Sequence, residues 1–394
     1  ARDARHLALG VRPLLCVHRI VPRQVVQVML DLVLDRLANL GIDVVLALGE
    51  LLDVVLKEGG SDLHLSTSVS PMLRVSSVLI PLSKYPPFTN KEIETILQSI
   101  VSEGLWSSFQ ENQAIDVSYT HKTNVRFRIN AYRAQGATSL ALRLIPHEVL
   151  SFSELNLPPV LEVFTQRKQG FFLAVGPVGH GKSPTLAAMI NRINDTRAAH
   201  ILTIEDPVEY LFLPKQSLIH QREIHVDTHD FRTALQSTFR EDVDVIMVGE
   251  MRDYETVSSA VTAAETGHLV LSTLHTNSAA QTIDRIIDMF PAEQQGQVRI
   301  QLAGSLIGVF SQRLIPRVSG GLIPAYELLI NNTAVGTLIR ESRTHELNGV
   351  IQVSSQEGMI DMDRSLADLV RRGEVTVEHA YEHAMDPKTF ERYL

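Results

Sequence analysis

The sequence GPVGHGKS, Gly176–Ser183, decides the fold of this chain. It matches the pattern G-x-x-x-x-G-K-[ST], follows an apolar run at Phe171–Val175 and precedes a helical stretch at Leu186–Ile193. In such a loop the glycines let backbone N–H groups surround phosphate oxygens, and the start of the next helix adds partial positive charge. The stretch therefore predicts a nucleotide-binding loop between a strand and a helix.

The residues of this loop have distinct expected roles. Lys182 is expected to contact the β- and γ-phosphates, and the Ser183 hydroxyl to bind Mg²⁺. His180 occupies a position that favours small residues, and we expect its side chain to face solvent. Pro184 removes a backbone N–H that would face the α-phosphate, which predicts weaker nucleotide binding than with threonine. The predicted nucleotide-binding residues are Gly176, Pro177, Val178, Gly179, His180, Gly181, Lys182, Ser183 and Pro184.

Three apolar runs after this loop end in polar residues. Glu205 follows ILTI, Glu250 follows VIMVG, and His275 follows LVLSTL. Apolar runs that alternate with helical stretches are typical of a parallel sheet covered on both faces, and such sheets bind ligands at the carboxyl ends of their strands. We expect Glu250 to activate water, Glu205 to bind Mg²⁺ or a water molecule, and His275 to sense the γ-phosphate.

The residues before the loop predict a smaller α+β unit. Short strands are expected at SDLHLS (61–66), at MLRV (72–75) and over Ile115–Leu144. A helix is expected from Thr89, which forms a capping box with Glu92. One or two amphipathic helices are expected over residues 25–56, and a mostly helical region from Gln281 to the end.

Composition and charge narrow the class of protein further. Apolar residues make up 44% of the 394 residues, which excludes a disordered chain. The net charge of −9 argues against a nucleic-acid partner. The single cysteine, Cys16, excludes a disulfide framework. No membrane span is expected, because Asp31 and Asp35 interrupt the most apolar stretch, and residues 1–22 lack a signal-peptide cleavage pattern.

Taken together, the four polar stretches resemble the Walker A, aspartate box, Walker B and histidine box of type II/IV secretion ATPases. Within that superfamily the chain is most similar to PilT-type twitching-motility ATPases. The likeness runs from about Leu46 to Leu394, and QREIHVDT (221–228), TAAETGHLV (262–270) and IDRIIDMFP (283–291) carry it as well.

The resemblance implies a hexameric, Mg²⁺-dependent ATPase that powers type IV pilus retraction. It implies an α/β, RecA-like core with a parallel-rich sheet and a PAS-like N-terminal domain, with ATP between them. Implied partners are identical subunits, an inner-membrane platform protein of the pilus and a paralogous retraction ATPase, at the cytoplasmic face of the inner membrane. The expected parts are an extension (1–45), the PAS-like domain (46–150), a linker (151–160), the core (161–320) and a helical subdomain (321–394).

The resemblance also assigns roles to individual residues. It implies catalysis at Glu250, a role for Glu205, and His275 as the histidine-box residue. Arginines of the N-terminal domain and of the core are implied to neutralise phosphate charge. These arginines are Arg126, Arg128, Arg133, Arg222 and Arg240.

Several residues depart from the family pattern and leave alternatives open. Besides the unusual loop residues, Val243 stands where proline is usual, and AVGTLI (334–339) replaces the AIRNLI motif that is tied to retraction. One alternative is a pilus-assembly or type II secretion ATPase, which the short chain and single cysteine disfavour. Others are a regulatory ring with little turnover, a nucleic-acid motor, and zinc binding by three histidines. Those histidines are His220, His225 and His229.

Overall fold

The structure is a computed structural model that describes residues 42–75, 78–122, 125–145 and 148–394. Cys16 and most of the predicted N-terminal helical region lie outside the described residues. The described chain divides into two compact units. One contains the residues up to Trp106 together with Arg133–Ser139, and the other contains Ser107–Tyr132 and Leu140–Leu394.

Six strands before the phosphate loop form one sheet in the order β3-β2-β1-β6-β5-β4. The antiparallel pairs include β1 with β2, β2 with β3, and β4 with β5. The strands are β1 (Asp62–Leu65), β2 (Met72–Val75), β3 (Val78–Pro81), β4 (Ala114–His121), β5 (Val125–Ala134) and β6 (Ala137–Ile145). Strands were expected at the positions of β1, β2 and β4–β6, and these expectations are confirmed.

Three helices accompany this sheet: α2 (Ile42–Lys57), α3 (Asn90–Ile100) and α4 (Glu103–Asn112). The predicted capping box starts α3: Thr89 Oγ1 accepts the Glu92 N–H at 3.3 Å, and the Glu92 carboxylate accepts the Thr89 N–H at 2.6 Å. Two backbone donors that the helix cannot satisfy internally are thereby paired, which sets where α3 begins.

The second sheet has seven strands in the order β13-β12-β7-β11-β10-β8-β9. All neighbours are parallel except β12 and β13. The parallel-rich α/β core predicted from the sequence is thus confirmed. Its strands are β7 (Gly170–Val175), β8 (His200–Glu205), β9 (Leu218–Glu223), β10 (Val245–Val248), β11 (Leu269–Leu274), β12 (Leu306–Pro316) and β13 (Leu322–Ile330).

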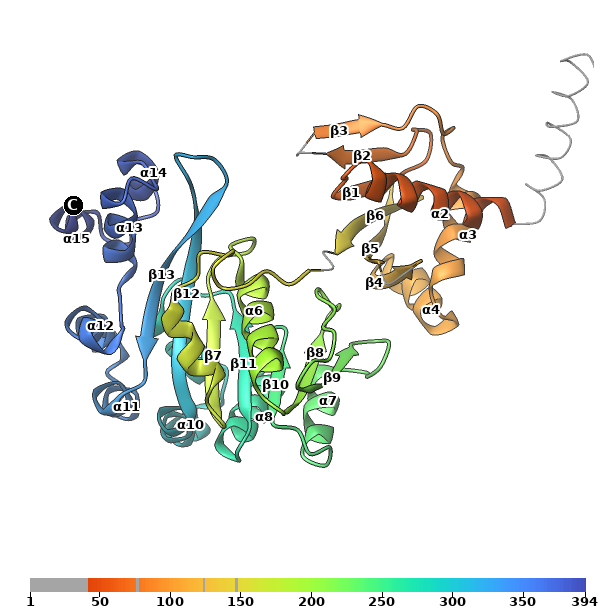
Figure 1. Cartoon of the computed structure of the whole chain (residues 1–394). Helices are drawn as coiled ribbons and strands as arrows, with labels where there is room; N and C mark the ends of the chain where they lie inside the picture. Colours follow the sequence, from red (N-terminus) through yellow and green to blue (C-terminus); the bar gives the residue numbers. More distant parts are fainter. Residues whose placement is uncertain (1–41, 76–77, 123–124, 146–147) are drawn as a thin grey trace, which may run out of the picture. The chain divides into compact units, whose positions relative to one another are not determined.

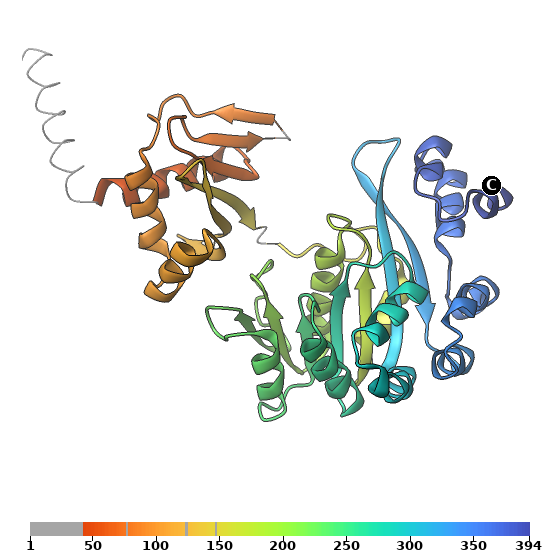
Figure 2. The ribbon, with the colours of Figure 1, turned by 180° about the vertical axis from the view of Figure 1, so that it is seen from behind.

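Helices cover both faces of this sheet, as Figures 1 and 2 show from opposite sides. On one face α6 packs Leu186 and Ile190 with Phe172 of β7. On the other face α8 and α10 pack with Phe171 and Leu173, the alternate residues of the same strand. Burial on both sides explains why β7 is apolar throughout. The helices from α5 to α10 are α5 (Glu162–Thr165), α6 (Lys182–Thr196), α7 (Phe231–Thr238), α8 (Tyr254–Glu265), α9 (Ala279–Asp288) and α10 (Ala292–Ser305), with the 3₁₀ turn η1 (Pro159–Leu161).

The region after Gln281 is mostly helical, as expected, but one long hairpin interrupts the helices. After α10 the long hairpin β12–β13 joins the core sheet and extends into the segment predicted as a helical subdomain (321–394). Leu306, Val309 and Phe310 have the i, i+3, i+4 spacing of a helix face, yet all three are buried in a strand. Leu306 and Val309 pack in the core on one face of the sheet and Phe310 packs in the core on the other. Both faces of β12 are therefore covered, and its apolar residues need not alternate.

Helices resume after the hairpin. They are α11 (Thr333–Arg340), α12 (Leu347–Val353), α13 (Met362–Arg371), α14 (Val377–Tyr381) and α15 (Pro387–Tyr393), with 3₁₀ turns η2 (Thr344–Glu346) and η3 (Ser355–Glu357). Within the ranges that the structure describes, no helix is both long enough and apolar enough to span a membrane.

Candidate functional site

The loop Gly176–Ser183 joins β7 to α6, as the sequence predicted. Gly176 has φ +136°, and a Cβ there would lie 2.3 Å from the backbone oxygen of Gln312. Gly181 has φ +83°, and a Cβ there would lie 2.8 Å from Gln312 Nε2. Gly176 therefore requires glycine for two reasons, its backbone conformation and the close approach of the β12 backbone. At Gly181 the contact is with a side chain, and the left-handed backbone is the stronger reason.

Lys182 is the first residue of α6, and only 8% of it is exposed. Its Nζ donates to the backbone oxygens of Gly176 and Pro177, each at 2.8 Å, and lies 3.1 Å from His275 Nδ1. Burial lowers the pKa of this ammonium group, while the charges of Glu250 and Glu209 act in the opposite direction. The Lys182 ammonium group is therefore bound by backbone oxygens of the phosphate loop and lies beside His275, the residue that follows β11.

Glu250 follows β10 and has a cationic or polar partner on each carboxylate oxygen. Oε1 lies 3.0 Å from His275 Nε2, and Oε2 lies 2.8 Å from the Arg252 guanidinium. Burial alone raises the pKa of Glu250, but the Arg252 hydrogen bond and the charges of Arg252 and Lys182 outweigh it and lower the pKa below its usual range. The carboxylate is therefore ionised near neutral pH, as a proton acceptor must be.

Glu205 ends β8, the strand beside β10, and is buried with 5% exposure. Oε1 accepts the Thr203 hydroxyl at 2.7 Å and the Gln221 amide at 3.3 Å, and Oε2 accepts the Glu209 N–H at 3.1 Å. Burial raises the pKa of Glu205 to about 7, although these hydrogen bonds act against the shift. Glu205 thus differs from Glu250 in having only neutral donors around it.

The remaining loop residues differ in exposure. Val178 is 78% exposed, and Gly179 is also exposed, whereas Ser183 and Pro184 are half-buried. The Ser183 hydroxyl makes no hydrogen bond within the described ranges, so its oxygen is available to a ligand. Pro184 is the third residue of α6, where a missing N–H breaks no helical hydrogen bond.

His180 corrects the expectation of a solvent-facing side chain. Its Nδ1 accepts the Leu314 N–H of β12 at 2.9 Å, and its ring is half-buried. Burial, followed by the charges of His383, Arg313 and Lys182, lowers the pKa of His180. The histidine is therefore part of the contact between the loop and β12.

Four of the five predicted arginines have carboxylate partners. Arg126 and the Ser118 hydroxyl both bond to buried Glu223, the last residue of β9. Arg128 pairs with Asp116 at 2.9 Å.

The other three arginines differ among themselves. Arg133 pairs with Glu94 at 2.7 Å, and Arg222 pairs with Glu241 at 2.9 Å. Arg240 follows α7, is exposed, and has no side-chain hydrogen bond or ion pair within the described part of the chain. The roles of all five arginines at phosphate groups stay predictions.

The structure thus brings Lys182, His275 and Glu250 together from three separate strand ends, as predicted. Arg252, two residues after Glu250, joins them as the partner of Glu250 Oε2. One contributor was missed. Gln312 lies 132 positions from its partner His180 and has no local motif, so only the pairing of β12 with β7 reveals it.

The described ranges contain no group of three or more His, Cys, Asp or Glu side chains placed to hold a metal ion. Of the three histidines weighed for zinc, His220 contacts His200 instead, with 2.9 Å between Nδ1 and Nε2.

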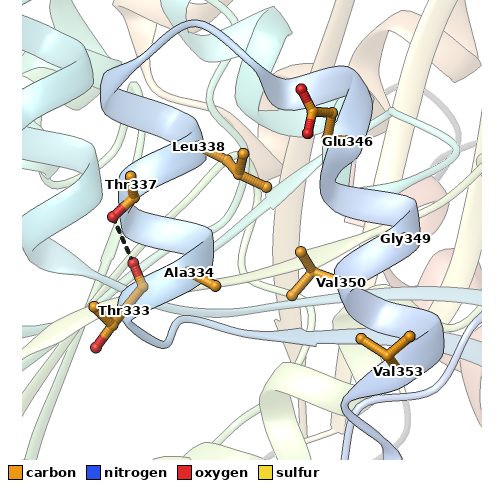
Figure 3. Close-up of a pocket in the computed structure, with 8 residues that line it drawn as sticks. All are labelled: Thr333, Ala334, Thr337, Leu338, Glu346, Gly349, Val350 and Val353. Atoms are coloured by element: carbon orange, nitrogen blue, oxygen red, sulfur yellow. Dashed lines mark hydrogen bonds between the residues drawn. The ribbon is translucent and has the colours of Figure 1, made fainter.

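A separate cavity of about 690 Å³ opens between α11 and α12 (Figure 3). Its lining is almost entirely apolar, and Leu338 and Val350 point toward the space between the helices. The AVGTLI segment (334–339) forms much of α11, and Thr337 Oγ1 bonds back to the Thr333 oxygen at 2.8 Å. No phosphate-loop residue lines this cavity, so it is not part of the nucleotide site.

Comparisons with known proteins agree with this geometry. The type IV pilus retractation ATPase PilT of Pseudomonas aeruginosa is 43% identical over 341 residues, which cover 86% of this chain and 99% of PilT. The type IV pilus ATPase PilU of the same organism is 38% identical, covering 85% of this chain and 88% of PilU. A crystal structure of the pilus retraction motor PilT with bound ADP aligns at a TM-score of 0.81 and 43% identity, covering 87% of this chain and 98% of that one.

A family described as "Type II/IV secretion system protein" matches residues 108–372, a range that contains the phosphate loop, both acidic strand ends and His275. The expected family is therefore confirmed: this chain belongs to the type II/IV secretion system protein family.

Proposed function

We propose that this chain is an ATP-hydrolysing motor that powers type IV pilus retraction. The observation that carries the proposal is the contact series from Lys182 through His275 to Glu250, beside a phosphate loop whose three glycines all have positive φ. The similarity to PilT and PilU over more than four fifths of the chain supports the pilus system as the place of action.

In the proposed reaction, a water oxygen attacks the γ-phosphorus of ATP in line with the leaving oxygen. Glu250 accepts the proton of that water, the bond from the γ-phosphorus to the bridging oxygen breaks, and ADP leaves with inorganic phosphate. Lys182 would move from the loop oxygens to the phosphates, since an ammonium group binds phosphate more strongly than a neutral carbonyl. The Nδ1 atom of His275 would then lose its hydrogen-bond donor, the Lys182 ammonium group, and the His275 ring would shift in response.

We propose Ser183 as the protein ligand of a nucleotide-bound Mg²⁺, because its hydroxyl is uncommitted and lies next to Lys182. Glu205 is the second candidate, through a water molecule, since its oxygens already accept three hydrogen bonds. When bound, the ion would neutralise charge that develops on the phosphate oxygens.

The proposed assembly is a ring of six identical chains, each with ATP held between its N-terminal domain and its core. Rotation of one domain against the other on ATP binding would supply force. The ring would act at the cytoplasmic face of the inner membrane, on the platform protein of the pilus, alone or with a PilU-like paralogue.

A nucleotide-dependent regulatory ring with little turnover is the second candidate function. The observation that favours it is Pro184, which denies the nucleotide one backbone N–H in the first turn of α6. A pilus-assembly or type II secretion ATPase is a less supported alternative. The altered AVGTLI segment is the observation that favours it.

The test is phosphate release from Mg²⁺-ATP by the full chain, with solution mass measured by light scattering on the same sample. The proposal predicts steady turnover and a mass near six times 43.8 kDa in the presence of nucleotide. A hexamer that binds ADP but releases no phosphate would favour the regulatory ring. A monomer with no nucleotide binding would contradict both.

A further inference from the structure

Gln312 lies on β12 directly beside the phosphate loop. In the parallel pairing of β12 with β7, Ser311 is opposite Val175, so Gln312 is level with Gly176, the first loop residue. The Gln312 side chain is only 1% exposed, and both of its polar atoms are used. Its Nε2 donates to the His180 backbone oxygen at 2.7 Å, and its Oε1 accepts the Thr185 hydroxyl at 2.6 Å.

The contact is direct and fixed on both sides. The approach that excludes a Cβ at Gly176 is to the Gln312 backbone, and the one at Gly181 is to its Nε2. Leu314, two residues after Gln312 on β12, donates its N–H to the ring of His180. Residue 180 is therefore held by its oxygen and by its side chain, both from β12.

The hydrogen bond from Gln312 to the His180 oxygen determines the direction of the Gly181 N–H group. A trans peptide is planar, and its C=O and N–H point to opposite sides. Because Gln312 binds the His180 oxygen, the N–H of Gly181 in the same peptide points away from β12. If this peptide flipped, a carbonyl oxygen would replace that N–H and repel a bound phosphate.

We propose that Gln312 is a positioning residue for nucleotide binding: its amide fixes the peptide between His180 and Gly181 so that the Gly181 N–H is presented to a nucleotide phosphate. The proposal rests on nucleotide binding at this loop, as proposed above. It assigns to β12 a role in the reaction that neither the loop motif nor the acidic strand ends contain.

The substitution Gln312→Glu isolates the donor, because it keeps the size of the side chain and the oxygen that faces Thr185. At pH 8 the introduced carboxylate cannot donate to the His180 oxygen. The ADP dissociation constant, measured by calorimetry on the full chain with Mg²⁺, should rise about tenfold over wild type. At pH 6 the carboxyl can be protonated and donate again, so the ratio to wild type should fall below about three.

Using the ratio to wild type at each pH cancels the titration of ADP itself. The charged groups that act on His180, next to this contact, are His383, Arg313 and Lys182. Ser311→Ala is the matched control. It removes another side-chain hydrogen bond, 3.1 Å to the Asn277 oxygen, from the adjacent buried residue of β12, and this bond does not involve the loop. Its ratio should stay below about three at both pH values.

A Gln312→Glu variant that binds ADP like wild type at pH 8, with full stoichiometry, overturns the inference. A loss at pH 8 that does not recover at pH 6 also overturns the donor role. If that variant does not fold, Gln312→Met fills the same space, and wild-type affinity in it overturns the inference equally. Wild-type protein that binds no ADP would instead contradict the proposed function.

Discussion

His275 Nε2 lies 3.0 Å from Glu250 Oε1, and this contact fixes what the histidine can do. Lys182 Nζ, 3.1 Å from Nδ1, can only donate, so Nδ1 accepts and Nε2 carries the proton toward Glu250. The ring therefore connects the lysine that is expected at the phosphates to the carboxylate that is expected to activate water. Phosphate binding by Lys182 would therefore affect Glu250 through the His275 side chain alone.

Removal of this ring should slow the reaction without weakening nucleotide binding. For His275→Ala we expect kcat for phosphate release to fall at least tenfold, because Glu250 loses its orienting donor, and the ADP dissociation constant to stay within about threefold. His268→Ala, at the opposite end of β11, is the control and should leave kcat unchanged. An unaltered kcat in the His275 variant would remove this residue from the mechanism.

Pro184 should weaken nucleotide binding. For Pro184→Thr we expect ADP to bind about tenfold more tightly, because the restored N–H can donate to a charged phosphate and such a hydrogen bond contributes roughly 1.5–3 kcal/mol. Calorimetric titration of ADP into both proteins measures the difference. Pro184→Ala should show a similar gain, since it restores the same N–H. Equal affinities in all three proteins would show that this position does not limit binding.

Glu205 should make stability depend on pH. Its pKa in the folded protein, about 7, lies above the ordinary value of 4.5. The stability from its protonated form is therefore fully present below pH 4.5 and is lost as the pH rises through about 7. Between these limits the free energy of unfolding of Glu205→Gln should improve relative to wild type by roughly 3 kcal/mol.

Urea unfolding of both proteins at pH 5, 6, 7 and 8 measures this difference. Glu111→Gln is the control, because Glu111 is exposed on α4. Its stability relative to wild type should be the same at every pH. If the free energy of unfolding of the Glu205 variant also differs from wild type by the same amount at every pH, this carboxyl is ionised throughout the range.

Much of the site could be predicted because its signals are local. The phosphate loop has a fixed spacing, and Glu205, Glu250 and His275 each end an apolar run. The parallel order of the strands then brings them to one edge of the sheet. Likewise, the capping box of α3 lies within four residues and was found from their identity alone.

What could not be predicted depends on pairing between distant segments. The spacing of Leu306, Val309 and Phe310 fits a helix, and only the place of β12 between two strands makes it a strand. The contact of Gln312 with the loop and the partial burial of His180 both depend on the position of β12. The partners of Arg126 and Arg128 on β5 depend in the same way on tertiary contacts, since arginine pairs with any carboxylate within reach.

The central claim is that Glu250 activates water for ATP hydrolysis at a loop held by Lys182. Its most direct test is phosphate release from Mg²⁺-ATP by wild type, Glu250→Gln and Lys182→Ala, with ADP affinity measured on the same samples and Lys168→Ala, exposed in the turn before β7, as control. We predict that Glu250→Gln loses at least about a hundredfold in turnover but binds ADP like wild type, and that Lys182→Ala loses both. Turnover near the wild-type rate in Glu250→Gln would contradict the account.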